Sequence, residues 1–307
     1  MKAIRIRLKA PVRVGGLKGF ESYDDTVHSD TIFGAIANSV AYLNLDFEDF
    51  IQRVKENEIL ISSALPFKDD LWLPAPMIKP RVRGLEREFL KKYKNCFVRK
   101  QIFEKILAGE EIDVTEEQEI NNMLAKSEKF FVYTDIASVA LDRQTASTNL
   151  YQYTVLSPKN CELCVLVDSS DFAFTQYLKP AFKLLADEGI GGNRNIGLGH
   201  FDFQIDDLNL RAPKSEFFTT LSLSIVDKRN LVSYDITKRG GYVFSRSGKN
   251  VRKPLFFMLR EGSVVRNDMG KLIDLESYGK YSEELGHRVF VYAKVFPASI
   301  SSDYFGR

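Results

Sequence analysis

The residues whose types and spacing are best suited to binding a ligand lie in one glycine-rich segment, Gly189-Ile190-Gly191-Gly192-Asn193-Arg194-Asn195-Ile196-Gly197-Leu198-Gly199-His200. Glycine reaches positive φ and has no Cβ, so such a run can turn its amides outward and let a phosphate approach the backbone. Arg194 would add a bidentate guanidinium donor for that phosphate. The spacing matches neither the G-x-x-x-x-G-K-[S/T] phosphate loop nor the G-x-G-x-x-G dinucleotide fingerprint. Glycine density alone favours a simple turn between a helix and a strand.

Histidine and cysteine are the other residues whose side chains could take part in catalysis or metal binding. His28, His200 and His287 could serve as acids or bases, because histidine titrates near neutral pH. Cys161 and Cys164 form a C-x-x-C, but positions three apart on a strand face opposite sides, so we expect core cysteines and no metal site. The chain's three cysteines are too few for a secreted disulfide scaffold, which favours a reducing cytoplasm. We find no cofactor motif and no activated serine or cysteine.

The elements around the glycine segment follow from hydrophobic periodicity. Helical spacing predicts a helix over Asp171 to Glu188, which Pro180 should kink or shorten, and alternation predicts a strand over Phe201 to Ile205. Near the N-terminus, Ala3 to Ala10 reads as an amphipathic strand, followed by a helix over Thr31 to Leu43. The cations of that first strand, Arg5, Arg7 and Lys9, form either a solvated face or a track for a nucleic-acid backbone.

Basic residues gather between Lys79 and Lys105, and acidic ones follow between Glu110 and Glu119. We expect an inserted helical lobe at about residues 80–128, with Thr115 and Gln118 as a capping box. The basic cluster indicates either a solvated helix surface or a contact with a partner or RNA. For the whole chain, 43 Lys and Arg against 41 Asp and Glu give no argument for nucleic acid.

The order of elements predicts an α+β fold. Residues 1–210 fit a βαββαβ, ferredoxin-like (RRM-like) module with the helical insertion and an exposed polar excursion between two strands around Ala146 to Tyr153. A linker at Arg211 to Ser215 leads to residues 215–307, which read as a β-rich, degenerate second ferredoxin-like module. Charges interrupt the hydrophobic residues at the N-terminus, so we expect neither a signal peptide nor an anchor there, and no apolar run reaches membrane-spanning length.

Four stretches, in this order, resemble the RAMP superfamily of CRISPR proteins and, within it, the fourth-subunit family of the Csm complex, the type III-A effector. They are His28-Ser29-Asp30-Thr31-Ile32-Phe33-Gly34-Ala35, Leu141-Asp142-Arg143-Gln144-Thr145, Gly189 to Phe201, and Glu261-Gly262-Ser263-Val264-Val265. Family members often carry a basic residue, a serine and an arginine where Asn193, Asn195 and His200 stand here.

The resemblance implies a subunit without catalytic activity, cofactor or metal. Such a subunit holds the 5′ repeat-derived tag of the CRISPR RNA (crRNA), caps the complex beside the large Palm-domain subunit, and contacts the neighbouring backbone RAMP subunit. The excursion after Arg143 resembles a thumb hairpin that presses on the guide–target duplex, so target RNA is a further partner. The residues expected to bind RNA are Gly191, Gly192, Asn193, Arg194, Asn195, Gly197, Gly199, His200, His28, Ser29, Arg143 and Tyr151.

Two alternatives remain open. RAMP relatives include metal-independent endoribonucleases that process repeat RNA, for which His28 and His200 would be candidates if the fold brought them to one cleft. The other alternative is a purely structural scaffold subunit, with the segment from Lys79 to Lys105 contacting protein.

Overall fold

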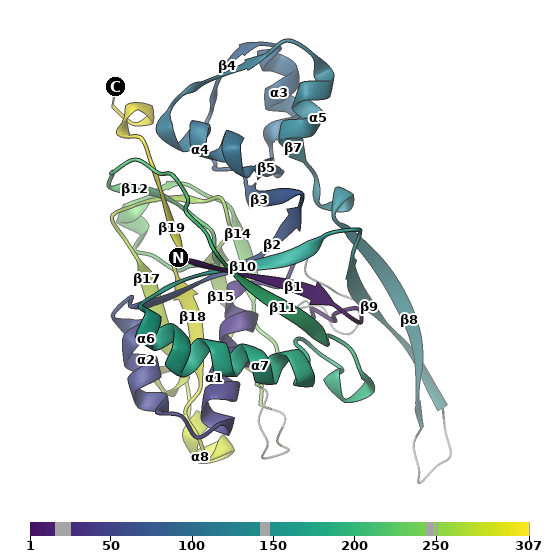
Figure 1. Cartoon of the computed structure of the whole chain (residues 1–307). Coiled ribbons are helices and arrows are strands. Elements are labelled where there is room, and N and C mark those ends of the chain that lie inside the picture. Colours follow the sequence, from purple (N-terminus) through teal and green to yellow (C-terminus); the bar gives the residue numbers. More distant parts are fainter. Residues whose placement is uncertain (16–25, 142–147, 244–248, 250, 307) are drawn as a thin grey trace.

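Figure 1 shows the computed structural model of the chain, which describes residues 1–15, 26–141, 148–243, 249 and 251–306. The fold is mixed α/β, as predicted, and its centre is a seven-stranded sheet with strand order β11-β1-β10-β2-β3-β5-β7. These strands are β1 (Lys2–Leu8), β2 (Ile59–Lys68), β3 (Asp70–Pro74), β5 (Phe97–Arg99), β7 (Leu124–Ala125), β10 (Glu162–Ser169) and β11 (Phe201–Asp207). Among the described residues, no helix is long and apolar enough to cross a membrane.

Helices α1 (Ser29–Tyr42), α2 (Phe47–Lys55) and α7 (Lys179–Glu188) belong to the core on one face of this sheet, together with Ile4 and Ile6 of β1. Within the sheet, β1 is antiparallel to both β10 and β11, and β10 is antiparallel to β2. The alternation of β1 is therefore as predicted, with its isoleucines directed at the helices and its arginines at the opposite face.

The kink or shortening predicted at Pro180 takes the form of a π-helical turn. A short helix α6 (Asp171–Ala173) and this turn, η2 (Phe174–Leu178), lead directly into α7. The residues at both junctions keep right-handed helical backbone angles, so the helix continues without interruption. Pro180, which has no N–H to donate, lies in the first turn of α7, directly after the change in hydrogen-bonding pattern.

The opposite face of the sheet carries a helical lobe and a second core. The lobe contains β4 (Arg81–Gly84), α3 (Glu86–Tyr93), α4 (Lys100–Ala108), β6 (Glu111–Val114) and α5 (Glu117–Met123), and it stands above the sheet in Figure 1. Strands β4 and β6 pair in parallel with Arg81 opposite Glu111 and Arg83 opposite Asp113. Opposite charges therefore face each other at two positions of this strand pair, an arrangement that favours the pairing.

The predicted capping box is displaced by one position. Glu116, not Thr115, is the N-cap of α5, and its partner at the third helical position is Glu119, not Gln118. The Glu119 carboxylate accepts hydrogen bonds from the backbone amides of both Thr115 and Glu116, at 2.7 and 3.1 Å. A carboxylate can serve two amides at once, which is why the acidic residue occupies this position.

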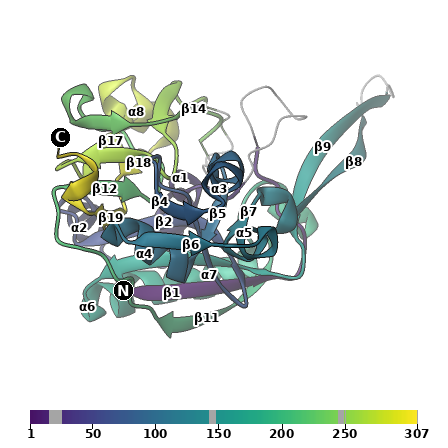
Figure 2. The ribbon, with the colours of Figure 1, turned by 90° about the horizontal axis from the view of Figure 1, so that it is seen from above.

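A long hairpin projects from the body of the molecule, as Figures 1 and 2 show. It consists of β8 (Phe131–Leu141) and β9 (Thr148–Pro158), paired along their full lengths. The excursion expected around Ala146 to Tyr153 is therefore mostly strand, because Thr148 to Tyr153 belong to β9. Residues 142–147, which include Arg143, lie outside the described part of the chain.

The last third is β-rich. Its strands and helix are β12 (Phe217–Thr220), β13 (Leu231–Ser233), β14 (Ile236–Arg239), β15 (Phe256–Leu259), β16 (Val264–Arg266), β17 (Gly270–Asp274), α8 (Tyr281–Leu285), β18 (Phe290–Lys294) and β19 (Pro297–Ile300). Strands β13, β16, β12 and β19 form one sheet in that order, while β14–β15 and β17–β18 are separate pairs. The alternation from Phe217 to Val226 continues beyond β12, but the ladder ends at Thr220 because Ser222 instead bonds the backbone of Lys294 and Phe296.

Candidate nucleic-acid interface

The glycine segment lies between α7 and β11, and hydrogen bonds connect it to the residues just after β1. Gly192 N–H donates to the carbonyl of Arg13 at 2.9 Å, and Gly199 N–H donates to the carbonyl of Pro11 at 2.9 Å. Ile190 N–H donates to the carbonyl of Gly199 at 3.0 Å, which closes the loop on itself. The expectation that the loop turns its amides outward is therefore wrong for these three amides.

Two glycines of this loop provide a test of its geometry. Gly199 (φ +75°) is packed so closely that a Cβ would lie 2.0 Å from the carbonyl oxygen of Ile190, whereas Gly197 (φ +89°) has nothing within 4 Å. We expect Gly199→Ala to lower the free energy of unfolding by about 3 kcal/mol or more, and Gly197→Ala by about 1 kcal/mol, because only the first adds a clash to the backbone strain. Urea denaturation of both variants measures the difference, and equal losses would contradict it.

Two arginines flank the loop. The Arg13 guanidinium donates to Asn193 Oδ1 at 2.8 Å and lies 4.8 Å from the ring centroid of Tyr153. Arg194 Nη1 is 3.4 Å from the carbonyl oxygen of Gly189 and 3.6 Å from a carboxylate oxygen of Glu188. Arg194 was expected here from the sequence, whereas Arg13 was not singled out. Its place between the buried Val12 and Val14 is the signal that could have found it.

The base of the hairpin packs against the same loop. Leu198 forms a small apolar cluster with Tyr153 and Val155 of β9, and Tyr151 is partly buried beside it. The structure thus brings Tyr151 close to the glycine segment, as the sequence-based list of RNA-binding residues requires. Asn195 and Gly197 are exposed on the outer side of the loop.

A cavity of 1480 Å³ begins at this loop and continues along α1 to the C-terminal third. Gly191, Gly192 and Arg194 line one end, and Arg239 to Val243 with Arg252 and Lys253 line another part. We call this cavity the α1 groove. Its cationic lining residues are Arg13, Arg194, Arg239, Arg252, Lys253 and Arg288, and its acidic ones are Asp30, Glu48 and Glu188. Among the lining residues that the structure describes, cations outnumber acids, which suits a polyanion.

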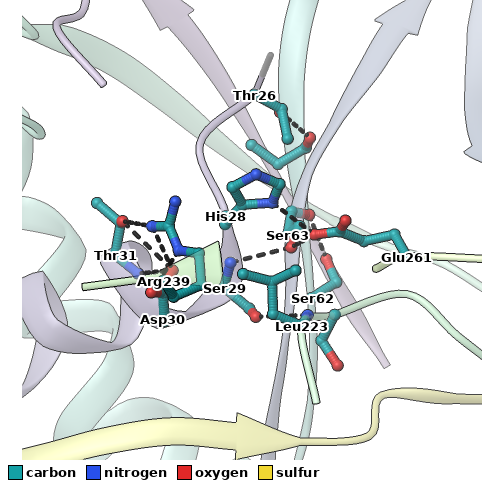
Figure 3. A network of polar contacts seen from close by, with 12 residues as sticks. Thr26, His28, Ser29, Asp30, Thr31, Ser62, Ser63, Leu223, Arg239 and Glu261 are labelled. Carbon is teal, nitrogen blue, oxygen red and sulfur yellow. Dashed lines mark hydrogen bonds and ion pairs between the residues drawn. The ribbon is translucent and has the colours of Figure 1, made fainter. Parts of the chain in front are cut away.

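His28 and Ser29, both expected to contact RNA, are instead buried in a polar network (Figure 3). His28 Nδ1 lies 2.7 Å from Glu261 Oε1, and the Ser63 hydroxyl donates to the same oxygen. Ser29 uses its amide to bind Ser63 and its hydroxyl to accept from the Leu223 amide. In this conformation neither side chain can reach RNA. The two motifs singled out in the sequence, around His28 and Glu261, are one structural unit.

The charges of this network strongly shift two carboxyl pKa values. Burial raises the pKa of Glu261, but the His28 charge and the hydrogen bonds from His28 and Ser63 outweigh it and bring the pKa to about 2. Burial likewise raises the pKa of Asp30, while Arg239 and Lys253 lower it to about 2. Arg239 binds Asp30 through both Nε and Nη2, at 2.9 and 3.0 Å (Figure 3). Both carboxylates are therefore held ionised in the interior.

The histidines do not form a common cleft. His28 is in the buried network, His200 directly follows the glycine loop, and His287 lines the α1 groove with its Nδ1 3.0 Å from the Arg288 carbonyl oxygen. The Ser63 hydroxyl bonds the Glu261 carboxylate and not the imidazole, so this trio lacks the relay of a Ser-His-acid triad.

The cations of β1, and Lys9 just after it, pair with acids of the neighbouring strands. Arg5 pairs with Glu162 and Asp206, Arg7 with Glu162, and Lys9 with Asp202. Of the two interpretations of this strand, the structure favours a solvated face with its own counter-charges. Cys164 is fully buried and Cys161 partly so, and the described residues contain no His, Cys, Asp and Glu group that could hold a metal ion.

The known proteins that this chain resembles in sequence include Csm4 proteins of CRISPR systems. Residues 213–300 match the family model of the CRISPR Csm4 C-terminal domain. The CRISPR system Cms protein Csm4 of Thermococcus onnurineus is 26% identical over 284 residues, covering 91% of this chain and 93% of the relative. That of Methanocaldococcus jannaschii is also 26% identical, with coverage of 91% and 92%.

Solved structures agree in fold. A chain in the crystal structure of a Csm1–Csm4 cassette in complex with pppApA superposes with a TM-score of 0.66 and 22% identity, covering 98% of this chain and 97% of that one. A chain of the Csm3–Csm4 subcomplex of the type III-A CRISPR-Cas interference complex gives 0.62 and 20%, covering 98% and 100%. The chain is thus similar to Csm4 proteins over about nine-tenths of its length, and its residues 213–300 match the Csm4 C-terminal domain.

Proposed function

We propose that this chain is a non-catalytic, cytoplasmic subunit of a type III-A CRISPR complex that binds the 5′ repeat-derived tag of crRNA. It would cap the complex beside the large Palm-domain subunit, contact a neighbouring backbone RAMP subunit, and meet target RNA at the β8–β9 hairpin. The match of residues 213–300 to the Csm4 C-terminal domain and the similarity to curated Csm4 relatives support this proposal, as does the presence of Csm4 with Csm1 and with Csm3 in structures of similar fold.

The observation that carries the RNA part of the proposal is the α1 groove. The glycine loop, Arg13 and Arg194 meet at one end of a cavity whose described lining residues include more cations than acids. Guanidinium groups and loop backbone can hold phosphates without reading bases, which suits a tag of fixed sequence. The groove also joins the two parts of the chain, so a bound strand would contact both.

The strand order supports a further inference about the fold. We infer a ferredoxin-like module in residues 1–210, because β11, β1, β10 and β2 are antiparallel neighbours in the order that a βαββαβ chain gives. Residues 215–307 would be the second, β-rich module. A separate apolar cluster supports this division, because all its buried members lie between Leu223 and Ala293.

The absence of catalysis is part of the proposal. A general base must reach the 2′-hydroxyl of its RNA, and the His28 side chain is 3% exposed and bonded to Glu261. Incubation of the full chain with repeat RNA should therefore yield no cleavage, and metal-independent cleavage would support the ribonuclease alternative.

Loss of either groove arginine is expected to weaken RNA binding. We expect Arg13→Ala and Arg194→Ala each to raise the Kd for single-stranded tag RNA about tenfold and to reduce its salt dependence by about one counterion, because each removes one phosphate contact. Fluorescence polarisation across a salt series measures both. Arg7→Ala is the matched control, since Arg7 is 76% exposed, paired with Glu162 and outside the groove. Unchanged affinity in both groove variants would exclude phosphate binding at this loop.

A further inference from the structure

The part of the α1 groove formed by the C-terminal third carries an exposed aromatic ring. Tyr242 lines the groove and is 60% exposed, and the Arg252 guanidinium lies 5.4 Å from its ring centroid. A backbone bridge pairs the same two residues and fixes their relative position. Nucleobases stack on exposed aromatic rings of this kind, and a neighbouring arginine strengthens such surfaces.

The backbone before this ring leaves room for a ligand. Gly240 and Gly241 also line the groove, and a Cβ added at Gly241 (φ +101°) would meet nothing within 4 Å. Of the glycines at positive φ in the first glycine loop, Gly199 and Gly191 are packed tightly against protein backbone, so they serve the fold. Gly241 has no such neighbour, and its positive φ therefore shapes an open surface and not a packed turn.

Two cations lie next to this surface and share one acid. Arg239 binds both carboxylate oxygens of Asp30, and Lys253 also interacts electrostatically with Asp30. No described residue forms a hydrogen bond with the Lys253 ammonium. The Lys253 ammonium is thus attracted to Asp30 without a hydrogen bond to it, at a partly desolvated place where an anion is a favoured partner. Burial lowers the pKa of Lys253, which is consistent with an ammonium whose charge is not fully balanced by nearby acids.

We infer that Tyr242, Arg252 and Lys253 form a nucleotide site in the α1 groove, which takes one nucleotide of single-stranded RNA. The base stacks on Tyr242, and the adjoining phosphodiester binds Lys253. This inference rests on the proposed function and deepens it, because it adds base stacking to phosphate binding and assigns it to the C-terminal part of the chain. Stacking accepts any base, so the site positions the strand without reading its sequence.

The test uses the full chain and labelled single-stranded RNA in which one nucleotide at a time is replaced by an abasic one. For the native protein, we expect one position at which removing the base raises Kd about tenfold. Tyr242→Leu should raise Kd for intact RNA by the same factor and lose the distinction at that position, while Tyr242→Phe should keep both. Tyr234→Leu is the control, because Tyr234 is 49% exposed on the same third of the chain but does not line the groove.

The outcomes separate this inference from the proposed function. If the native chain binds no RNA, both fail. If Arg194→Ala weakens binding but Tyr242→Leu does not, or if the abasic series is flat, only the nucleotide site is overturned. Lys253→Met provides an independent measurement, since it should lower the salt dependence of binding by about one counterion without changing the abasic pattern. An unchanged salt dependence would remove Lys253 from the site.

Discussion

Replacing Glu261 by alanine is expected to lower the free energy of unfolding by about 3–5 kcal/mol. The Glu261 carboxylate is the common acceptor for His28 and Ser63, and its side chain is 9% exposed. Its removal would leave a buried imidazole and a buried hydroxyl without their partner in the seam between the first helix, β2 and the C-terminal third (Figure 3). Urea or guanidinium denaturation of the variant, followed by circular dichroism, measures the loss.

A surface carboxylate provides the matched comparison. Glu283 pairs with Lys280 on α8, and their side chains are 67% and 76% exposed. Glu283→Ala should cost less than about 1 kcal/mol, because an exposed ion pair is screened by water. If Glu261→Ala were as mild as Glu283→Ala, the network would not couple the two parts of the chain.

Stability is also expected to decline steeply in acid, by roughly 5 kcal/mol between pH values of about 4.5 and 2. The pKa values of Glu261 and Asp30 are both lowered to about 2, from ordinary values of 4.5 and 3.8. Folding therefore favours the ionised carboxylates. Their contribution is complete above the ordinary values and is lost as the pH falls through the lowered ones. Denaturation curves at a series of pH values measure the slope.

The control for this pH dependence is Asp30→Asn. It removes one of the two shifted carboxyls, so its stability should be lower at neutral pH but should fall less steeply in acid. This variant removes the ion pair between Asp30 and Arg239, which accounts for the lower stability at neutral pH. An acid slope equal to that of the native chain would show that Asp30 does not titrate with folding.

Much of the fold could be predicted from the sequence because its signals are local. The alternation in β1, the apolar stripe of α1 and the stop at Gly189 each depend on residues close together in the chain. The capping box differs from the prediction by one position because three acidic residues stand near the start of α5. Spacing alone does not tell which of their carboxylates accepts a hydrogen bond from the backbone amide at the start of the helix. The end of β12 at Thr220 depends on Ser222 meeting Lys294, a contact that no local pattern records.

The site was predicted less completely for the same reason. The glycine loop and Arg194 were found because they are one segment of sequence. Arg13 was missed because Asn193 and Tyr153, which it contacts, lie far from it in the sequence. Tyr242 was missed because the groove brings it to α1 from the last third of the chain. His28 was assigned to RNA on the strength of its motif, although Glu261, which explains the motif, lies 233 residues away.

The long stretch of sequence between His28 and Glu261 has a consequence for folding during synthesis on the ribosome. When β11 leaves the ribosome, all the strands of the central sheet have been made, but Arg239 and Glu261 have not. His28 and Asp30 must then stay hydrated, so the start of α1 remains open until the last third of the chain arrives. Contacts of such high sequence separation form late and slowly. The nascent N-terminal part should therefore be the species most in need of a chaperone, and a chain that stops near residue 210 should not complete its own interior.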